Sequence, residues 1–221
     1  MIYVTDAWKQ AHKGASIGFM IVENVLNAKQ SEALEVSKRK LKDELQARFT
    51  NREALFNHFP ISVYSNYYKQ YKKSYHVLKQ LESVIFKGKE IPCIAAVVEA
   101  MFMAELKNGL LTAGHDYNAL RFPLTLDAAA GDEAYFLING KEQVVKPQDM
   151  MLYDAAGIIS SIIHGPDLRT RILPETQKVV FVVYAPVGIS KDTVVNHLSD
   201  IYDYVKLVSP DAKIEYQEVY T

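Results

Sequence analysis

Two arginines one residue apart, Arg169 and Arg171, follow a turn at His164-Gly165-Pro166 in the stretch SSIIHGPDLRTRILPET, residues 160–176. If this stretch is extended, both guanidinium groups point to the same side and can grip one carboxylate or phosphate through forked hydrogen bonds. His164 is then expected at the mouth of the same pocket. The alternative is a surface loop with weak salt bridges.

A second group of residues that could do chemistry lies in VYSNYYKQYKKSYHVLKQL, residues 63–81, which we expect to be one helix. Its tyrosines recur at steps of three and four residues, and Lys69, Lys72 and Lys73 fall mostly elsewhere on the helix. Interleaved aromatic rings and lysines can stack bases and hold phosphates, so these three lysines are candidates for RNA binding. The alternative is that the tyrosine stripe is a core face with a solvated basic rim.

The familiar catalytic signatures are missing. The GxxxxG spacing of GLLTAGHD (109–116) lacks the Lys-Ser/Thr pair of a phosphate-binding loop, and no GxSxG nucleophile motif is present. The six histidines never form HxxxH or HExxH, so we expect no metal site and no cofactor. Cys93, the only cysteine, is expected to be a buried, inert thiol in a helix begun by Pro92. Asp116 is expected to cap a turn.

Composition narrows the class of protein. The chain has 221 residues, 49% of them hydrophobic, and a net charge of −1, so it can bury a sizeable core and its overall charge favours no partner. Residues 1–90 carry 15 Lys and Arg against 9 Asp and Glu, whereas residues 91–221 carry 10 against 17. A single cysteine, no signal-peptide core and no apolar run of membrane-spanning length indicate a cytoplasmic protein.

The order of expected elements predicts an α+β fold in one domain, residues 1–221. We expect a buried strand over 15–25, a helix over 31–49 capped by Ser31, a short helix from Asn51, and a buried helix over 91–109. Short β-like runs over about 110–185 predict a sheet-rich core. A capped helix over 190–208 and a strand over 213–220 complete the chain.

Three ordered stretches carry a resemblance: AAVVEAMFMAELKNGLLTAGHDYNAL, AAAGDEAYFLINGKEQVVKPQDMMLYDAAG and PETQKVVFVVYA. Together they resemble the B3/B4 domain, the tRNA-editing domain in the β subunit of bacterial phenylalanyl-tRNA synthetase, and its free-standing relatives. Residues 91–185 match best. The residues that fit the family pattern are Val97, Val98, Glu99, Asp116, Gly131, Glu133, Asn139, Gly140, Glu142, Asp149, Asp154, Glu175 and Thr176.

The resemblance implies an α+β editing-domain fold and a pocket that distinguishes tyrosine from phenylalanine. Three polar groups of the family's pocket fall on Phe102, Ala113 and Val182, all apolar, so tyrosine editing by that geometry is not expected. The family's glycine turn falls near Ile163 and His164. Aminoacylation is not expected, because that activity belongs to another subunit. The pocket candidates are Phe102, Ala113, Glu133, Ile163, His164, Arg169, Arg171 and Val182.

Three hypotheses follow. The first is an RNA-binding protein, with tRNA as partner, that in one version deacylates a mischarged species other than tyrosyl-tRNA. The second is a small-molecule binding protein in which Arg169 or Arg171 clamps a carboxylate or amino acid. The third is a non-catalytic interaction module whose apolar helix, 91–107, packs on a partner. The sequence indicates no catalytic residue and no oligomeric state.

Overall fold

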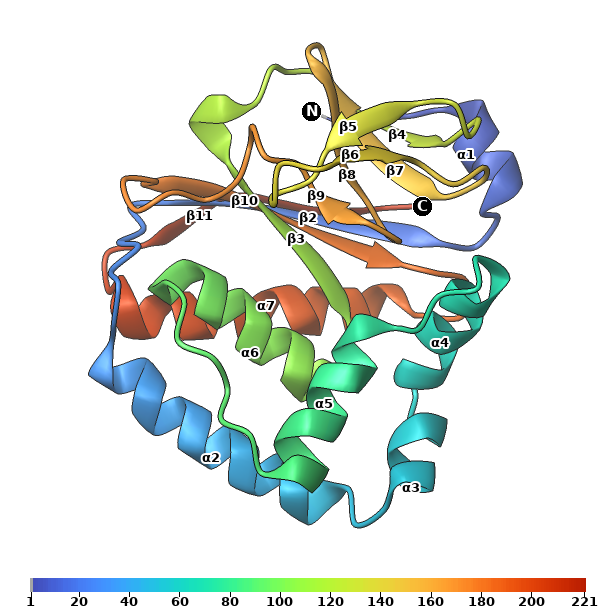
Figure 1. Ribbon diagram of the computed structural model, residues 1–221. Coiled ribbons are helices and arrows are strands. Elements are labelled where there is room, and N and C mark those ends of the chain that lie inside the picture. Colours follow the sequence, from blue (N-terminus) through green and yellow to red (C-terminus); the bar gives the residue numbers. More distant parts are fainter. Residues whose placement is uncertain (1) are drawn as a thin grey trace.

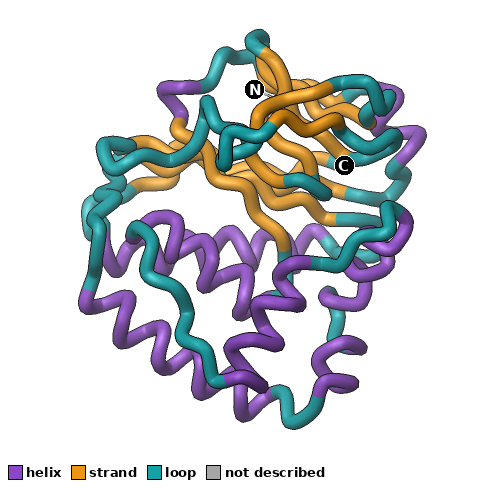
Figure 2. The backbone as a smooth tube through the Cα atoms, viewed as in Figure 1, coloured by secondary structure: helices purple, strands orange, loops and turns teal. Residues whose placement is uncertain are grey.

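A computed structural model describes residues 2–221, and it consists of two β-sheets above a layer of helices (Figures 1 and 2). The helices all lie on one side of the larger sheet except α1 (Asp6–Ala11), which lies beside the smaller one. Strands and helices are mixed along the chain. The predicted α+β fold is therefore confirmed.

The larger sheet is antiparallel and has the order β11-β2-β10-β3. Its strands are β2 (Ser16–Glu23), β3 (Leu111–Asp116), β10 (Lys178–Ala185) and β11 (Lys213–Tyr220). β2 and β10 are buried along almost their whole length, as their continuous apolar sequence requires. A Cβ at Gly18 would lie 2.4 Å from the side chain of Val194, so the helix packed below this sheet touches its backbone directly.

The smaller sheet has the order β1-β4-β7-β8-β9. Its strands are β1 (Ile2–Val4), β4 (Leu124–Ala128), β7 (Met150–Asp154), β8 (Gly157–Ser161) and β9 (Gly165–Pro166), and a hairpin of β5 (Ala134–Phe136) and β6 (Glu142–Val144) accompanies them. Figure 1 shows this sheet above the larger one. Buried hydrogen bonds between β8 and the strands β3 and β10 tie the two sheets together.

The helical layer contains α2 (Glu32–Arg48), α3 (Arg52–Asn57), α4 (Ile61–Gln70), α5 (His76–Lys87), α6 (Ala96–Asn108) and α7 (Lys191–Val208). The predicted caps are confirmed: the side chains of Ser31, Asn51 and Ser190 each accept a backbone N–H in the first turn of α2, α3 and α7. A short 3₁₀ turn, η1 (Tyr117–Ala119), is capped by Asp116, also as predicted.

The stretch 63–81 is two helices, which corrects the prediction of one. The chain leaves α4 at Gln70 and enters α5 at His76, and Lys72 takes a left-handed φ of 55° in the turn between them. Tertiary packing fixes this break, because the ring of Tyr75 stacks on that of Tyr64 at 4.7 Å and its hydroxyl donates to the carbonyl of Gly109. Both tyrosines are buried, so the core alternative for the stripe is confirmed.

Helix α6 also begins later than predicted. Pro92 and Cys93 lie in the segment before it, and Cys93 is exposed, so the prediction of a buried thiol inside a helix is wrong. The carboxylate of Glu99 holds this segment in place by accepting the N–H of Ile94 at 2.6 Å. Since α6 packs on α7 and β3 and is largely buried, its apolar surface is used inside the fold and does not serve as the partner-docking helix of the third hypothesis.

Across residues 2–221, none of the helices combines the length and the apolar character needed to cross a bilayer.

Candidate functional site

A small cavity of about 170 Å³ lies beside β3, where α5, α6, β8, β9 and β10 meet it. Its volume is many times that needed for one water molecule, so it has room for a group of several heavy atoms. The wall is mostly apolar with a few hydroxyl and carboxyl groups, a composition typical of sites for small ligands. The lining residues are His76, Met101, Glu105, Leu111, Thr112, Ala113, Ser161, Gly165, Pro166 and Tyr184.

Glu105 is the polar centre of this cavity. It comes from α6 and is only 4% exposed, and its Oε1 accepts the backbone N–H of Thr112 at 2.7 Å. Burial raises the pKa of Glu105 to about 8, so most of the carboxyl groups are protonated at pH 7. Among residues 2–221 the hydrogen bond of Glu105 to Thr112 uses Oε1, and Oε2 forms neither a hydrogen bond nor an ion pair. The cavity therefore contains a neutral acid with one oxygen available to a ligand.

Tyr184 reaches the same cavity from β10 at the end of a buried hydrogen-bond chain. Its hydroxyl lies 2.5 Å from Ser160 Oγ, which lies 3.4 Å from Nε2 of His115. Nδ1 of His115 lies 2.7 Å from Thr170 Oγ1, and Thr170 donates its proton to Asp167.

The proton positions follow from the acceptor at the end of this chain. Because Thr170 donates to Asp167, its oxygen accepts from Nδ1 of His115. Burial lowers the pKa of His115 to about 3, so the ring is neutral and its Nε2 accepts from Ser160. Ser160 in turn accepts from Tyr184. The phenol proton of Tyr184 is thus directed away from the cavity, and its oxygen lone pairs are left as acceptors.

Positive charge acts on the turn that walls the cavity. His164 immediately precedes the lining residue Gly165, and burial together with the charges of Lys73 and Lys146 lowers the pKa of His164 to about 4. Lys73 also precedes by three residues the lining residue His76. No Lys or Arg is among the residues that line the cavity itself.

Of the pocket residues predicted from the family resemblance, only some lie at the Glu105 cavity. Ala113 lines the cavity, and Val182 is its direct partner across β3 and β10, so their side chains lie on the same face of the sheet. Ile163 is buried and donates its backbone N–H to Asp149 at 3.2 Å. Phe102 packs against the core. Neither Ile163 nor Phe102 lines the cavity.

Glu133 has a structural role that the prediction did not include. Its two carboxylate oxygens accept the backbone N–H groups of Ala130 and Gly131 at 2.9 and 2.8 Å, and these bonds lower the pKa of Glu133. It therefore closes a turn before β5 and lines none of the cavities described here.

The two arginines line a different cleft, of about 480 Å³, together with Phe136 and Leu168. Arg169 is held by Asp154 at 2.8 Å and by the carbonyl of Ala119, so its guanidinium is already paired. Arg171 donates to the carbonyl of Leu168 and has no acidic partner among residues 2–221. His164, which was expected at the mouth of the same pocket, is not among the residues that line this cleft.

Sequence reasoning missed Glu105, Ser161 and Tyr184. One signal was present: Glu105 interrupts the apolar run AVVEAMFMAELKNG, and an acidic residue on a helix that is apolar nearly all round must be buried. Ser161 and Tyr184 carry no comparable local signal, because they come from strands of two different sheets, β8 and β10, that only the tertiary fold brings together.

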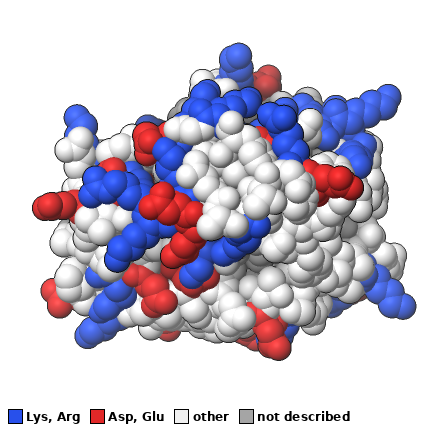
Figure 3. All heavy atoms as spheres, turned by 90° about the horizontal axis from the view of Figure 1, so that it is seen from below, with Lys and Arg blue, Asp and Glu red and all other residues white. Residues whose placement is uncertain are grey.

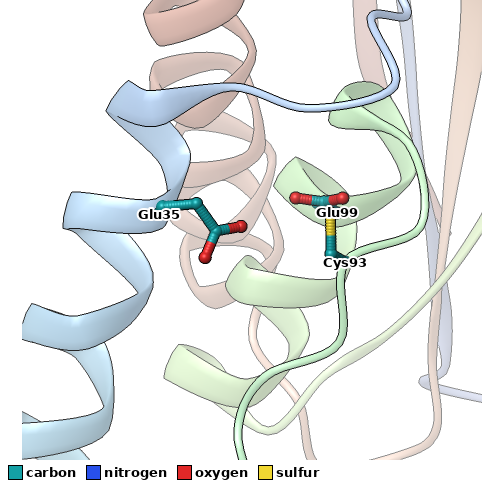
Figure 4. A group of neighbouring side chains, drawn as sticks. All are labelled: Glu35, Cys93 and Glu99. Atoms are coloured by element: carbon teal, nitrogen blue, oxygen red, sulfur yellow. The ribbon is translucent and has the colours of Figure 1, made fainter.

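A group of possible metal ligands lies elsewhere: Glu35, Cys93 and Glu99 offer atoms within 4.8 Å of one another (Figure 4). The ammonium of Lys38 lies 2.6 Å from a carboxylate oxygen of Glu35 and 2.6 Å from one of Glu99. Lys38 is 4% exposed and Glu99 1%. The ammonium of Lys38 is thus the cation that these carboxylates bind, and its ion pair with Glu99 joins α2 to α6.

A scan against protein-family models and a search of curated proteins both find no match. Among solved structures, the chain is similar to an N-terminal fragment of the phenylalanyl-tRNA synthetase β subunit from Pyrococcus horikoshii, with a TM-score of 0.52 and 13% identity. The alignment covers 100% of this chain and 54% of that fragment, so this chain spans about half the fragment's length. At this identity the similarity shows the fold: the chain is built like part of a phenylalanyl-tRNA synthetase β subunit.

Proposed function

We propose that the chain binds aminoacylated RNA, with the side chain of the amino acid in the Glu105 cavity and RNA phosphates on the lysines near its mouth. The observation that carries the proposal is the cavity itself, whose mostly apolar interior contains one carboxyl group with a raised pKa and no charged Lys or Arg. The fold shared with a fragment of an aminoacyl-tRNA synthetase subunit supports the same class of ligand. As an extension, we propose that the protein hydrolyses the ester bond between the amino acid and the bound RNA.

The interior favours an uncharged amino-acid side chain. Glu105 supplies a carboxylic acid proton, and Tyr184 supplies an oxygen acceptor. A ligand carboxylate would meet the buried carboxyl of Glu105 in a cavity without a lining arginine or lysine, and a buried charge without a partner is strongly unfavourable. The aminoacyl linkage removes that charge, because the carboxylate of the amino acid is then an ester.

The RNA contacts are expected to be few. Lys and Arg side chains alternate with Asp and Glu on the helical face of the molecule, which carries no broad patch of one sign (Figure 3). The exposed lysines Lys72 and Lys73 lie in the turn before α5, next to the cavity wall. A local contact of two or three phosphates gives a modest salt dependence, since each neutralised phosphate adds a slope of about −0.7 for single strands.

We predict that aminoacyl-tRNA binds at least several-fold more tightly than the same tRNA after deacylation, measured by filter binding at two salt concentrations. The double variant Lys72→Ala/Lys73→Ala should lower the salt slope by about 1 to 2, because two phosphate contacts are lost. The matched control is Arg39→Ala/Lys40→Ala on α2, which removes two exposed charges away from the cavity. Equal affinity for tRNA and for a polyanion such as heparin would overturn the proposal.

The cavity is tested separately with Ala113→Leu, which narrows it from the β3 side. This variant should bind deacylated tRNA as before but lose the preference for the aminoacylated form. A preference that survives in a folded Ala113→Leu protein would place the aminoacyl group elsewhere. Following release of labelled amino acid from the same complexes measures deacylation.

A second candidate function rests on Arg171, whose guanidinium lines the 480 Å³ cleft without an acidic partner. Such an arginine beside Phe136 can bind the carboxylate of a small aromatic or aliphatic acid. We predict that one member of a carboxylate panel raises the melting temperature by several degrees at concentrations well above its Kd. Arg171→Ala should abolish the increase and Arg171→Lys should retain part of it. No increase with any carboxylate excludes this candidate.

A further inference from the structure

A third hollow, of about 330 Å³, lies between α4 and the segments that follow α1, β6 and β10. Five residues of α4 and its C-terminal end form one wall at helical spacing, and they include Asn66, Gln70 and Tyr71. The opposite wall includes His12 and Gln148. We call this hollow the amide cleft, and its lining residues are Ala11, His12, Val63, Asn66, Tyr67, Gln70, Tyr71, Gln148, Met150, Pro186 and Val187.

His12 lines the amide cleft and has a ring nitrogen without a hydrogen-bond partner. It is 8% exposed, and its Nε2 has no hydrogen-bond partner among residues 2–221. Burial lowers the pKa of His12, which favours the neutral form of the ring. Buried polar atoms without partners are rare in folded proteins, and each one needs an explanation.

Gln148 is held in an unusual backbone conformation at the same place. Its φ is 64°, a left-handed value that few residues other than glycine and asparagine adopt. Its backbone N–H donates to the carbonyl of Ala129 at 2.7 Å, which keeps the turn in this shape. Strained backbone persists where the surrounding structure holds it, and it occurs often at binding sites.

The lining offers many hydrogen-bonding groups but no fixed charge. Three primary amides, those of Asn66, Gln70 and Gln148, line the cleft together with the phenol of Tyr71 and the imidazole of His12. No Asp, Glu, Lys or Arg lines it. Amide side chains pair with the edges of nucleobases, which present donors and acceptors side by side. Aromatic and apolar surfaces such as Tyr71 and Pro186 accommodate the flat faces of a base.

We propose that the amide cleft binds one unpaired nucleobase, with the side-chain amides of Asn66 and Gln70 forming hydrogen bonds to its edge. The three lysines Lys69, Lys72 and Lys73 flank the cleft residues Gln70 and Tyr71 in sequence, and they would hold the attached phosphate. This inference deepens the proposed RNA binding by adding a base contact, but its test requires no RNA.

The test uses free nucleosides and their 5′-monophosphates. Trp8 is the one tryptophan of the chain, and its ring centroid lies 6.0 Å from that of His12, so its fluorescence reports on the cleft. We expect at least one of adenosine, guanosine, cytidine and uridine to change this signal saturably. The double variant Asn66→Ala/Gln70→Ala should raise the Kd for that nucleoside at least tenfold. Both positions are exposed, so the variant should fold, and a thermal melt checks it.

Two controls separate the parts of the inference. Gln30→Ala, an exposed amide outside the cleft, should leave nucleoside binding unchanged. The monophosphate should bind more tightly than its nucleoside, and Lys72→Ala/Lys73→Ala should remove that difference only. Three results would overturn the inference: a saturable change of Trp8 fluorescence with ribose alone, no such change with any nucleoside, or the same nucleoside Kd for the parent and the folded Asn66→Ala/Gln70→Ala variant. Tight tRNA binding without nucleoside binding would overturn it and leave the proposed function standing.

Discussion

Replacing Glu105 by glutamine should make the protein more stable than the parent at pH 8, by on the order of 3 kcal/mol or more. The native pKa of Glu105 is about 8, against an ordinary value of 4.5. Between these two values the unfolded chain releases the proton while the native protein retains it. The native state binds more protons, so the stability of the parent falls as pH rises, at up to about 1.4 kcal/mol per pH unit.

The glutamine variant isolates this effect. Its amide oxygen can still accept the N–H of Thr112, and its side chain does not titrate. Urea unfolding at pH 4, 6 and 8 should therefore give a parent-minus-variant difference that is small at pH 4 and grows to pH 8. Asp149, whose pKa burial raises to about 7, is present in both proteins and cancels in that difference. The exposed Glu53 provides the control, since Glu53→Gln should give a flat difference. A flat difference for Glu105→Gln would mean that the carboxyl is hydrated and ordinary.

Replacing Lys38 by methionine should cost about 3–5 kcal/mol of stability, because Glu99 would then be an unpaired charge in the interior. Glu99 is 1% exposed, whereas Glu35, the other partner of Lys38, is 45% exposed and can return to water. Chemical denaturation at pH 7 measures the loss. The surface pair of Lys42 and Glu90 supplies the control: Glu90 is 76% exposed, so Lys42→Met should cost less than about 1 kcal/mol.

The double variant Lys38→Met/Glu99→Gln tests the reason for this loss. A neutral amide at position 99 can still accept the N–H of Ile94 and leaves no buried charge. It should recover a large part of the stability lost in Lys38→Met. If the double variant is as unstable as Lys38→Met alone, the loss comes from packing of the lysine chain and the ion pair is not its cause.

The elements with local signals could be predicted from the sequence. Ser31, Asn51 and Ser190 each cap a helix as expected, because a capping side chain bonds within its own first turn. The break in 63–81 could not be predicted in this way. It depends on the contact of Tyr75 with Tyr64 and Gly109, and the last of these is 34 residues away.

The candidate site was harder to predict from the sequence, because its residues also meet through contacts between distant parts of the chain. Ala113 was named only through the family resemblance, and it lines the cavity. Arg169 drew attention by its type and spacing, yet its charge is taken up by Asp154. The partners of Lys38 show the limit most clearly: Glu99 lies 61 positions further on, and only the packing of α2 on α6 brings them together.

The hydrogen-bond chain from Asp167 to Tyr184 connects two separate cavities, so the proton positions in one depend on those in the other. Asp167 lines the cleft of the two arginines, and Tyr184 lines the Glu105 cavity. Each link of this chain has a single proton to give, so reversing the bond at Asp167 would reverse every bond after it. The phenol of Tyr184 would then turn its proton towards the cavity. The direction of the Tyr184 hydroxyl in the cavity therefore depends on the direction of the hydrogen bond at Asp167, in the other cleft.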